Sequence, residues 1–302
     1  MHRRRAVELA GAALATASVL PTALAQQRSF STTRHAAPSS QRKLTIMVGG
    51  AFTSMDPHSF NSGPNNALTG YVFEPLIRFD AEFRLQPALA VGWRAVDEKT
   101  WEIKLRQGVK FHDGAPFTAD DVVFSFARIP TLLRSPESFV YAVKPLTQTE
   151  VVDQYTLRLH TAAPVPLMPY NLTNVAIVSK QHGDGMTTAS FNSLQSAIGT
   201  GPYRATAFAI GEHAMFQRNE SWWDKQPYWA TVSYRVVSDN TARIAALRTG
   251  EADVIDQVPT AEAAALKANP KVDVVAMPGQ RLIYLQPDAS RMVTPFVTDQ
   301  AG

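Results

Sequence analysis

The chain has 302 residues, of which 45% are hydrophobic and 18% are charged, and these proportions are typical of a globular protein that can form two domains. It contains no cysteine, which excludes disulfide bonds, thiolate metal sites and a cysteine nucleophile. The net charge is only +3 and no run of Lys and Arg alternates with aromatic residues, so the sequence gives little support to nucleic-acid binding.

The N-terminus predicts export to the periplasm. Residues 1–25 combine a basic start, a mildly apolar stretch over 6–20 and an A-x-A-like cleavage site at residues 23–25. The apolar stretch is too short and alanine-rich for a convincing membrane span. Arg4 and Arg5 leave the twin-arginine route open beside the general secretory route. An amphipathic helix at a cytoplasmic N-terminus is the alternative.

Residues 26–42 are polar, rich in Ser and Thr and without periodicity, which predicts a flexible linker. The folded part is expected to begin at Lys43, with an apolar strand that ends at Gly49 and Gly50. A polar loop over 51–64 follows. A helix is then expected from near Asn65 through Phe73.

The loop after this first strand is the best candidate for a ligand site. Ligands in α/β proteins bind near the carboxyl ends of strands. The predicted ligand-binding residues of this loop are Phe52, Thr53, Ser54, Met55 and, more weakly, Asn61. In the alternative interpretation, Phe52 and Met55 are buried in the core, and the hydroxyls of Thr53 and Ser54 form hydrogen bonds with backbone groups of the loop. The Asp56-Pro57 dipeptide next to them predicts a turn.

A compact unit is predicted over residues 85–128. In the segment WEIKL, residues 101–105, apolar and charged side chains alternate with the period of two that a half-buried strand shows. His112-Asp113-Gly114 supplies turn chemistry. Thr118 stands three residues before Asp121, which predicts an N-terminal cap and an amphipathic helix after it.

A second capped helix is predicted nearer the C-terminus. Asn240 or Thr241 is expected to cap a helix over residues 242–249, and Gly250 fits the position that ends it. A strand over 252–258 is expected to follow.

Several sequence motifs follow one another along residues 43–288 in a fixed order. They comprise Leu85, Pro87, Leu89, Ala90 and Trp93; Leu105, Arg106 and 108–114; 117–119, Asp121 and Val122; and, more loosely, 73–76, 199–203, Asn219, Trp222, Trp223 and 246–253. This order resembles the extracellular solute-binding proteins of family 5, the receptors of peptide and nickel ABC importers.

The resemblance implies an α/β fold, with a periplasmic-binding-protein-like lobe of mixed sheet and flanking helices plus an inserted α+β subdomain. The main lobe would comprise residues 43–84 and 197–280, and the inserted subdomain residues 85–196. Residues 281–302 would begin the crossing to a second lobe. A second lobe needs about 100 to 200 further residues, so the chain is expected to be truncated, with that lobe largely missing.

The same resemblance implies function. A monomer would capture a small peptide or similar polar solute by hinge closure and deliver it to ABC transporter permease subunits, its only link to the membrane. Arg281 would bind a carboxylate and Tyr284 would stack on the ligand. Tyr141 is a further candidate to face the cleft, because it follows the first long predicted helix. A local ion pair for Arg281 and surface packing for Tyr141 are the alternatives. Peptides, nickel complexes, opines and sugars all remain open as solutes.

No enzymatic constellation emerges from the sequence, and no metal or cofactor is predicted. There is no G-x-S-x-G motif, and Gly199-Thr200-Gly201 lacks the Lys that a phosphate-binding loop needs. The histidines of the predicted folded part are dispersed, without metal-binding spacing: His58, His112, His160, His182 and His213. A binding protein is therefore expected, with an exported hydrolase and a protein-interaction module as alternatives.

Overall fold

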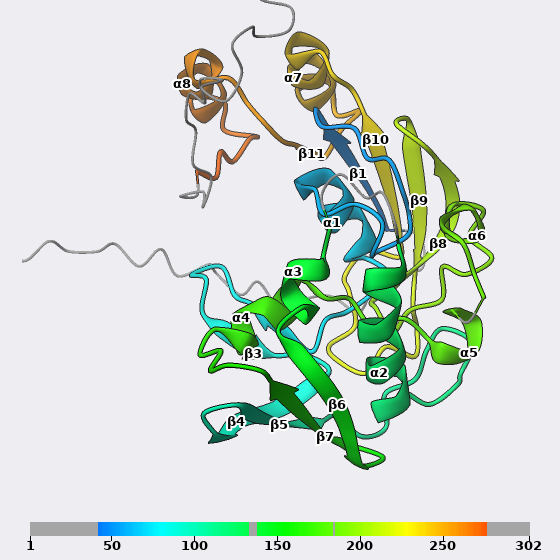
Figure 1. The fold of residues 1–302 in the computed structure, drawn as a ribbon. Helices are drawn as coiled ribbons and strands as arrows, with labels where there is room; N and C mark the ends of the chain where they lie inside the picture. Colours follow the sequence, from blue (N-terminus) through cyan, green and yellow to red (C-terminus); the bar gives the residue numbers. More distant parts are fainter. Residues whose placement is uncertain (1–41, 133–137, 184, 277–302) are drawn as a thin grey trace, which may run out of the picture. The chain divides into compact units, whose positions relative to one another are not determined.

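The computed structural model describes residues 42–132, 138–183 and 185–276. A five-stranded sheet with the order β11-β1-β10-β9-β8 forms the main part of this region (Figure 1). Its strands are β1 (Lys43–Val48), β8 (Tyr203–Ala209), β9 (His213–Arg218), β10 (Thr231–Val236) and β11 (Val254–Ile255).

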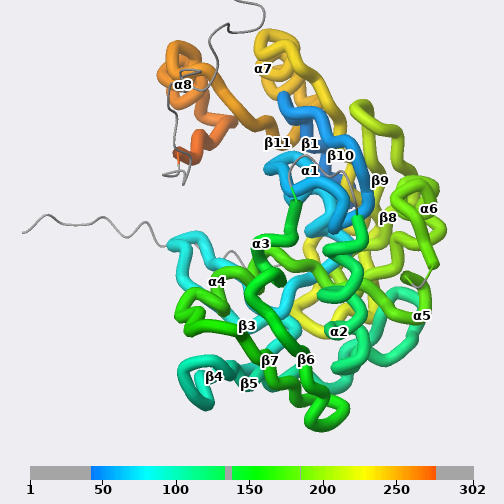
Figure 2. The backbone as a smooth tube through the Cα atoms, in the orientation of Figure 1, coloured from blue at the N-terminus to red at the C-terminus, as the bar shows by residue number. Residues whose placement is uncertain are grey.

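The sheet is mixed, as the family resemblance implies. Strand β1 pairs in parallel with β10 on one side and with β11 on the other, whereas β10, β9 and β8 are antiparallel neighbours. In Figure 2 the blue β1 lies beside β10 and β11, although the paired residues Lys43 and Thr231 are 188 positions apart and Ile46 and Val254 are 208 positions apart. The apolar end of β1, at Met47 and Val48, is buried, which suits a strand with neighbours on both sides.

A second sheet has the order β4-β5-β7-β6, and β2 pairs with β3 beside it. The strands are β2 (Ile77–Phe79), β3 (Leu85–Pro87), β4 (Ala90–Asp97), β5 (Thr100–Leu105), β6 (Leu146–Asp153) and β7 (Thr156–Thr161). Strand β5 contains the predicted WEIKL segment, and its Ile103 lies opposite Leu157 of β7. Both side chains are fully buried.

The helices that the structure describes are short. They are α1 (Gly63–Thr69), α2 (Ala119–Arg128), α3 (Val140–Val143), α4 (Met168–Asn171), α5 (Lys180–Gly183), α6 (Thr188–Asn192), α7 (Asn240–Thr249) and α8 (Thr260–Lys267), with 3₁₀ turns at Ile129–Thr131 and Leu172–Asn174. In the described part of the chain, none of these helices has the length and apolar character needed to cross a membrane.

Helix α2 begins where the sequence predicts. The Thr118 backbone N–H donates to the Asp121 carboxylate, which closes a capping box. Val122 and Phe126 lie one turn apart on the buried face of the helix, which packs against the second sheet (Figure 1).

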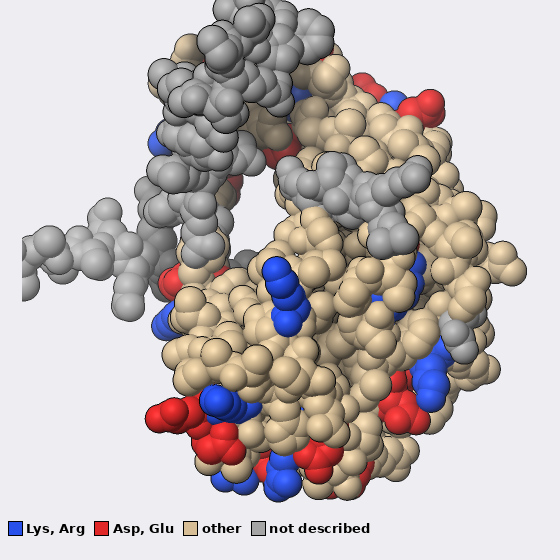
Figure 3. Space-filling view, viewed as in Figure 1, with Lys and Arg blue, Asp and Glu red and all other residues tan. Residues whose placement is uncertain are grey.

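Each sheet has its own hydrophobic core. The core on the second sheet includes Leu89, Ile103, Phe117, Phe126 and Leu157. The core on the main sheet includes Phe52, Leu68, Phe73, Phe216 and Val232. Figure 3 shows the charged residues of one face mostly gathered along its lower edge, over the β4–β7 sheet, while the middle of that face is largely uncharged.

Two predicted helices differ in their bounds. The helix expected from near Asn65 through Phe73 starts at Gly63 and ends at Thr69. It ends early because the next residues bond across the fold: the Tyr71 and Val72 carbonyls accept hydrogen bonds from the region of Gly201 and Tyr203. Such tertiary hydrogen bonds outweigh weak local helix propensity.

Helix α7 is capped by Asp239, not by Asn240 or Thr241 as the sequence suggested. The Asp239 side chain accepts a hydrogen bond from the Ala242 N–H, and Gly250 ends the helix in the left-handed conformation as predicted. The strand expected over 252–258 is reduced to Val254–Ile255, because only these residues pair with β1.

Candidate functional site

The loop that follows β1 begins at the carboxyl edge of the main sheet. Asp256 follows β11 directly, and its Oδ1 accepts a hydrogen bond from the Gly49 N–H at 2.8 Å. Val237 follows β10 directly, and its N–H donates to the Val48 carbonyl. A side chain at Gly49 would meet the buried Arg243 guanidinium, with its Cβ 2.9 Å from Nη1. The loop therefore leaves the sheet at the meeting point of three parallel strands, which is where the sequence analysis placed a ligand site.

Phe52 and Met55 have no exposed surface in this structure. The Phe52 ring packs at centroid distances of 5.7 Å from Phe208 and 6.0 Å from Tyr234. The Phe52 carbonyl accepts a hydrogen bond from the Gly211 N–H in the β8–β9 turn. Both side chains thus occupy the core, in line with the alternative interpretation of these two residues.

The exposed face of the loop is polar and uncharged. Thr53 is exposed, and its N–H donates to Asn65 Oδ1 at 2.8 Å, while Asn65 Nδ2 donates back to the Thr53 hydroxyl at 3.1 Å. Asn66 Nδ2 donates to Asn61 Oδ1 at 2.8 Å. Asn65 is buried, so the exposed groups are the Thr53 hydroxyl and the Asn66 amide, which can both donate and accept hydrogen bonds.

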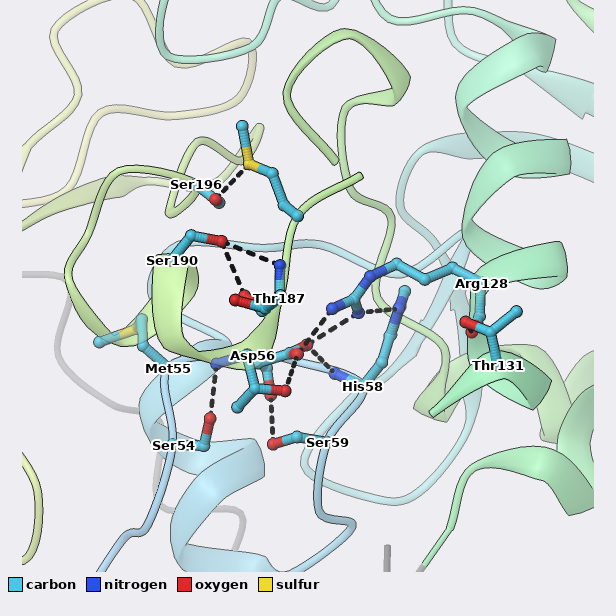
Figure 4. A network of polar contacts seen from close by, with 12 residues as sticks. Ser54, Met55, Asp56, His58, Ser59, Arg128, Thr131, Thr187, Ser190 and Ser196 are labelled. Carbon is cyan, nitrogen blue, oxygen red and sulfur yellow. Dashed lines mark hydrogen bonds and ion pairs between the residues drawn. The ribbon is translucent and has the colours of Figure 1, made fainter. Parts of the chain in front are cut away.

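Behind the loop lies a buried ion pair between Asp56 and Arg128 (Figure 4). Arg128 Nη2 donates to Asp56 Oδ2 at 2.6 Å and Nη1 donates to Oδ1 at 2.9 Å, a bidentate arrangement. The exposed fractions of the two side chains are 0% for Asp56 and 5% for Arg128. Burial alone would raise the pKa of Asp56, but the hydrogen bonds and positive charge of Arg128 outweigh it and lower this pKa.

His58 lies beside this ion pair, and its imidazole is neutral. Its Nε2 lies 2.7 Å from the Ala176 carbonyl, which can only accept, so Nε2 carries the proton. Its Nδ1 lies 3.0 Å from Arg128 Nη1 and is left to accept. Burial, and then the neighbouring Arg128 charge, lower the pKa of His58 to about 4.

The segment around α6 holds the loop from another side. Asn192 Oδ1 accepts hydrogen bonds from the Ser54 hydroxyl at 2.9 Å and from the Met55 N–H at 2.8 Å. The Thr188 hydroxyl donates to Asp56 Oδ2 at 2.8 Å. Ser54 is 4% exposed, so its hydroxyl serves the loop itself.

A second buried polar group, at some of the motif residues, joins the segment between α1 and β2 to the segment before β8 and to the segment after β9. Glu74 Oε2 accepts hydrogen bonds from Trp223 Nε1 at 2.8 Å and from the Thr200 hydroxyl at 2.9 Å. Burial raises the pKa of Glu74. These contacts lie between segments that are far apart in sequence, so these motif residues hold the fold together.

His112 belongs to this same junction. Its Nε2 lies 3.0 Å from the Gly201 carbonyl, and its Nδ1 accepts from the Gly199 N–H at 3.3 Å, so the ring is a neutral Nε2–H imidazole. Burial lowers the pKa of His112 to about 4. With both nitrogens bonded to backbone, the ring is already committed to structural contacts.

The remaining predicted site residues divide into two groups. Tyr141 lies on α3 with 44% of its surface exposed, available for contact. Arg281 and Tyr284 lie outside the described residues. Within the described ranges, no group of three or more His, Asp or Glu side chains is placed to hold a metal ion.

A surface hollow of about 450 Å³ lies at the start of α2, away from the candidate loop. It is lined by Ala115, Pro116, Thr118, Asp120, Asp121, Ser179, Lys180 and Gln181. Its acidic pair belongs to the first turn of α2, and Lys180 Nζ is 3.8 Å from Asp120. None of the predicted site residues borders it.

The buried partners of the loop do not follow from the sequence. The sequence predicts a turn at Asp56 and gives no role to Arg128. One signal was present: Asp121, Ser125 and Arg128 are spaced by four and then three residues and share the buried face of α2. Polar residues on such a face need buried partners, but the sequence does not say which.

The family of the chain follows from comparison with known proteins. A family model described as bacterial extracellular solute-binding proteins, family 5 (Middle), matches residues 84–300. This match extends over more than half of the sequence, so the protein belongs to that family of solute-binding proteins.

Two curated relatives illustrate the similarity. The glutathione-binding protein GsiB of Pectobacterium atrosepticum is 30% identical over 242 residues, which are 78% of this chain and 46% of the relative. GsiB of Salmonella typhimurium is 28% identical over 251 residues, or 81% of this chain and 48% of the relative. The chain therefore spans about half the length of the curated relatives it matches.

Solved structures confirm the predicted periplasmic-binding-protein-like lobe. The ABC transporter-associated periplasmic binding protein DppA of Helicobacter pylori, in complex with the peptide STSA, matches with a TM-score of 0.67 and 26% identity over 76% of this chain and 49% of DppA. OppA of Haemophilus influenzae, in complex with the peptide RPPGFSPFR, matches with a TM-score of 0.67 and 25% identity over 76% of this chain and 48% of OppA.

Proposed function

We propose that this chain forms the solute-capturing lobe of a periplasmic binding protein that delivers a short peptide to an ABC importer. The observation that carries the proposal is the loop after β1. It presents the exposed Thr53 hydroxyl and the exposed Asn66 amide of α1 at the carboxyl edge of the main sheet, and the buried Asn65 and the Asp56–Arg128 pair hold the loop from the protein side. Membership in family 5 supports a binding role rather than catalysis.

A short peptide is the proposed solute because it matches the exposed groups of the loop. Peptide N–H and C=O groups need partners that accept and donate, and hydroxyl and amide side chains do both. The relatives named above are described with glutathione or peptides. Thr53 and Asn61 are the proposed contacts of the described loop, Tyr141 a contact from α3, and Arg281 and Tyr284 contacts from the segment that follows.

The proposed architecture keeps the domain boundaries of the sequence analysis. Residues 43–84 and 197–280 form the main lobe, residues 85–196 form the inserted subdomain, and the chain after residue 280 leads toward a second lobe. Solute bound between two lobes would favour the closed state by its extra contacts there. The permease then recognises that state.

The location is also proposed from the sequence. Residues 1–25 act as an export signal, residues 26–42 act as a linker, and the monomeric protein works in the periplasm. It meets the membrane only through the permease subunits. The relative DppA is described as periplasmic and ABC transporter-associated, which supports this location.

Isothermal titration calorimetry of the purified chain with glutathione and with the peptide Ser-Thr-Ser-Ala tests the proposal. Weak but saturable binding of either solute without hydrolysis is expected, because the lobe described here supplies only part of the contacts that two lobes would make. Thr53→Val should weaken binding by about five- to tenfold, the value of one lost hydrogen bond. Thr206→Val is the matched control, because its hydroxyl bonds only the Met215 carbonyl in the exposed β8–β9 ladder. Turnover of either solute, or the same loss in the control, would contradict the proposal.

A further inference from the structure

The Asp56 carboxylate is saturated with hydrogen bonds. Oδ1 accepts from Arg128 Nη1 and from the backbone N–H of His58 at 3.0 Å. Oδ2 accepts from Arg128 Nη2 and from the Thr188 hydroxyl. With four donors and no exposed surface, this carboxylate does not reach a solute. Its bonds instead tie together the loop, the last turn of α2 and the first turn of α6 (Figure 4).

The same network continues into the residues beside Thr53. The Asp56 N–H donates to the Ser54 hydroxyl at 3.0 Å, and that hydroxyl donates to Asn192 Oδ1. The Met55 N–H donates to the same oxygen. Ser54 and Met55, which follow the exposed Thr53, are therefore both bonded to Asn192, which lies 138 and 137 positions away along the chain.

This arrangement specifies geometry more than it adds stability. A buried ion pair gains little over a well-packed apolar pair, because desolvation of both charges offsets their attraction. A bidentate Arg–carboxylate pair does, however, hold its two partners in one relative orientation. Here one partner is in the candidate loop and the other lies 72 residues away on α2.

We infer that Asp56, Arg128, Thr188 and Asn192 are positioning residues of the solute site. They set the conformation of residues 52–55 before the solute arrives, so that binding does not have to order the loop. This inference rests on the proposed function. Apparent affinity falls in proportion to the population of the binding-competent loop, so loosening the network weakens every solute by the same factor.

Two mild variants test the inference in the full chain. Arg128→Lys keeps the charge but loses the two-pronged hydrogen bonding, and Thr188→Val removes one donor to Asp56 without changing side-chain size. Thr206→Val is again the matched control. Affinities for glutathione and Ser-Thr-Ser-Ala are measured by calorimetry, and exchange of the Met55 and His58 amide protons is followed by mass spectrometry.

Both variants should bind each solute about tenfold more weakly, with the ratio of the two affinities unchanged, as expected when the competent population falls to a tenth. Thr53→Val, in contrast, removes a proposed contact and should change that ratio. Amide exchange at Met55 and His58 should become faster in the variants and remain unchanged in the control. A purely structural network would lower thermal stability without a uniform loss of affinity.

Wild-type affinity in Thr188→Val would overturn the inference, and so would unchanged amide exchange. Thr188→Val decides alone if Arg128→Lys does not fold. A third outcome separates the two proposals: the wild-type chain binds neither solute, but the Met55 and His58 amide protons exchange faster in the variants. The proposed peptide function then fails, while the role of the network in holding the loop conformation stands. The two proposals can thus be rejected separately.

Discussion

Gly199 lies directly against the backbone of Val72. A Cβ at Gly199 would overlap the Val72 carbonyl oxygen, and that oxygen accepts a hydrogen bond from the Gly201 N–H at 2.9 Å. The Gly-Thr-Gly-Pro motif therefore lets two backbones approach where β8 starts, beside the end of α1. Such close approach is a reason for glycine that is unrelated to phosphate binding.

Gly199→Ala should destabilise the chain by about 3 kcal/mol or more, because an added methyl group collides with rigid backbone in a packed region. Gly92→Ala is the control, since nothing lies within 4 Å of a Cβ at that position. It should change the free energy of unfolding by less than about 1 kcal/mol. Urea unfolding followed by tryptophan fluorescence measures both, and equal effects would contradict the assignment.

Arg128→Met should destabilise the chain by about 3–5 kcal/mol, because it leaves the Asp56 carboxylate buried and unpaired. The double variant Asp56→Leu/Arg128→Met removes both charges and should recover much of that loss. A double-mutant cycle from chemical denaturation measures the coupling between the two residues. Strictly additive effects would argue against the ion pair.

Acid should destabilise the chain through its two neutral buried histidines. The pKa of His58 and the pKa of His112 are each lowered to about 4 in the folded state, below the ordinary value of 6.5. The unfolded state therefore binds more protons between these values. The stabilising contribution is present above about pH 6.5 and is lost as pH falls toward 4, by up to about 3 kcal/mol for each histidine.

Unfolding free energies at pH 7, 5.5 and 4.5 measure this dependence. His112→Gln is expected to reduce the loss of stability between pH 7 and 4.5, because one of the two protonation sites is removed. His213→Gln is the control, because His213 is exposed at the start of β9. A chain equally stable at pH 7 and pH 4.5 would be incompatible with neutral buried imidazoles.

Glu74→Gln should change the free energy of unfolding by less than about 1 kcal/mol, because the side-chain oxygen of Gln can still accept from Trp223 and Thr200.

The stability of the wild-type chain should also depend on pH through Glu74. Burial raises the pKa of Glu74, so its contribution to the free energy of unfolding is fully present below about pH 4.5 and is lost as pH rises through that raised pKa. The Gln variant should lack this loss. Glu74→Ala leaves the Trp223 N–H and the Thr200 hydroxyl without an acceptor, so it should lower the free energy of unfolding by about 2–4 kcal/mol, measured by thermal or urea unfolding. Equal stability of the two variants would show that the hydrogen bonds at this position contribute little.

Local patterns in the sequence predicted several elements well. The alternation in WEIKL became β5, the Thr118–Asp121 spacing became the cap of α2, and the apolar run before Gly49 became β1. Each of these signals depends on residues within a few positions of one another. The early end of α1 was missed because distant backbone groups around Gly201 bond to its C-terminal side.

For the candidate site, the sequence predicted the loop but not its support. The rule that ligands bind at the carboxyl ends of strands identified residues 51–64 as a candidate. It did not separate Phe52 and Met55, which are buried, from Thr53, which is exposed. A loop has no periodicity from which burial can be inferred, so only its packing against Phe208 and Tyr234 decides which side chains face inward.

The amino-acid sequence alone identified the family resemblance, the mixed α/β character and the loop after the first strand, because these depend on local order and spacing. The pairing of Asp56 with Arg128, the neutral state of His58 and the joining of Glu74 to Trp223 were decided only by tertiary structure. Each requires burial and a partner distant along the chain. Hydrogen bonding and desolvation act through space, so these contacts exist only once the sheets and helices have packed.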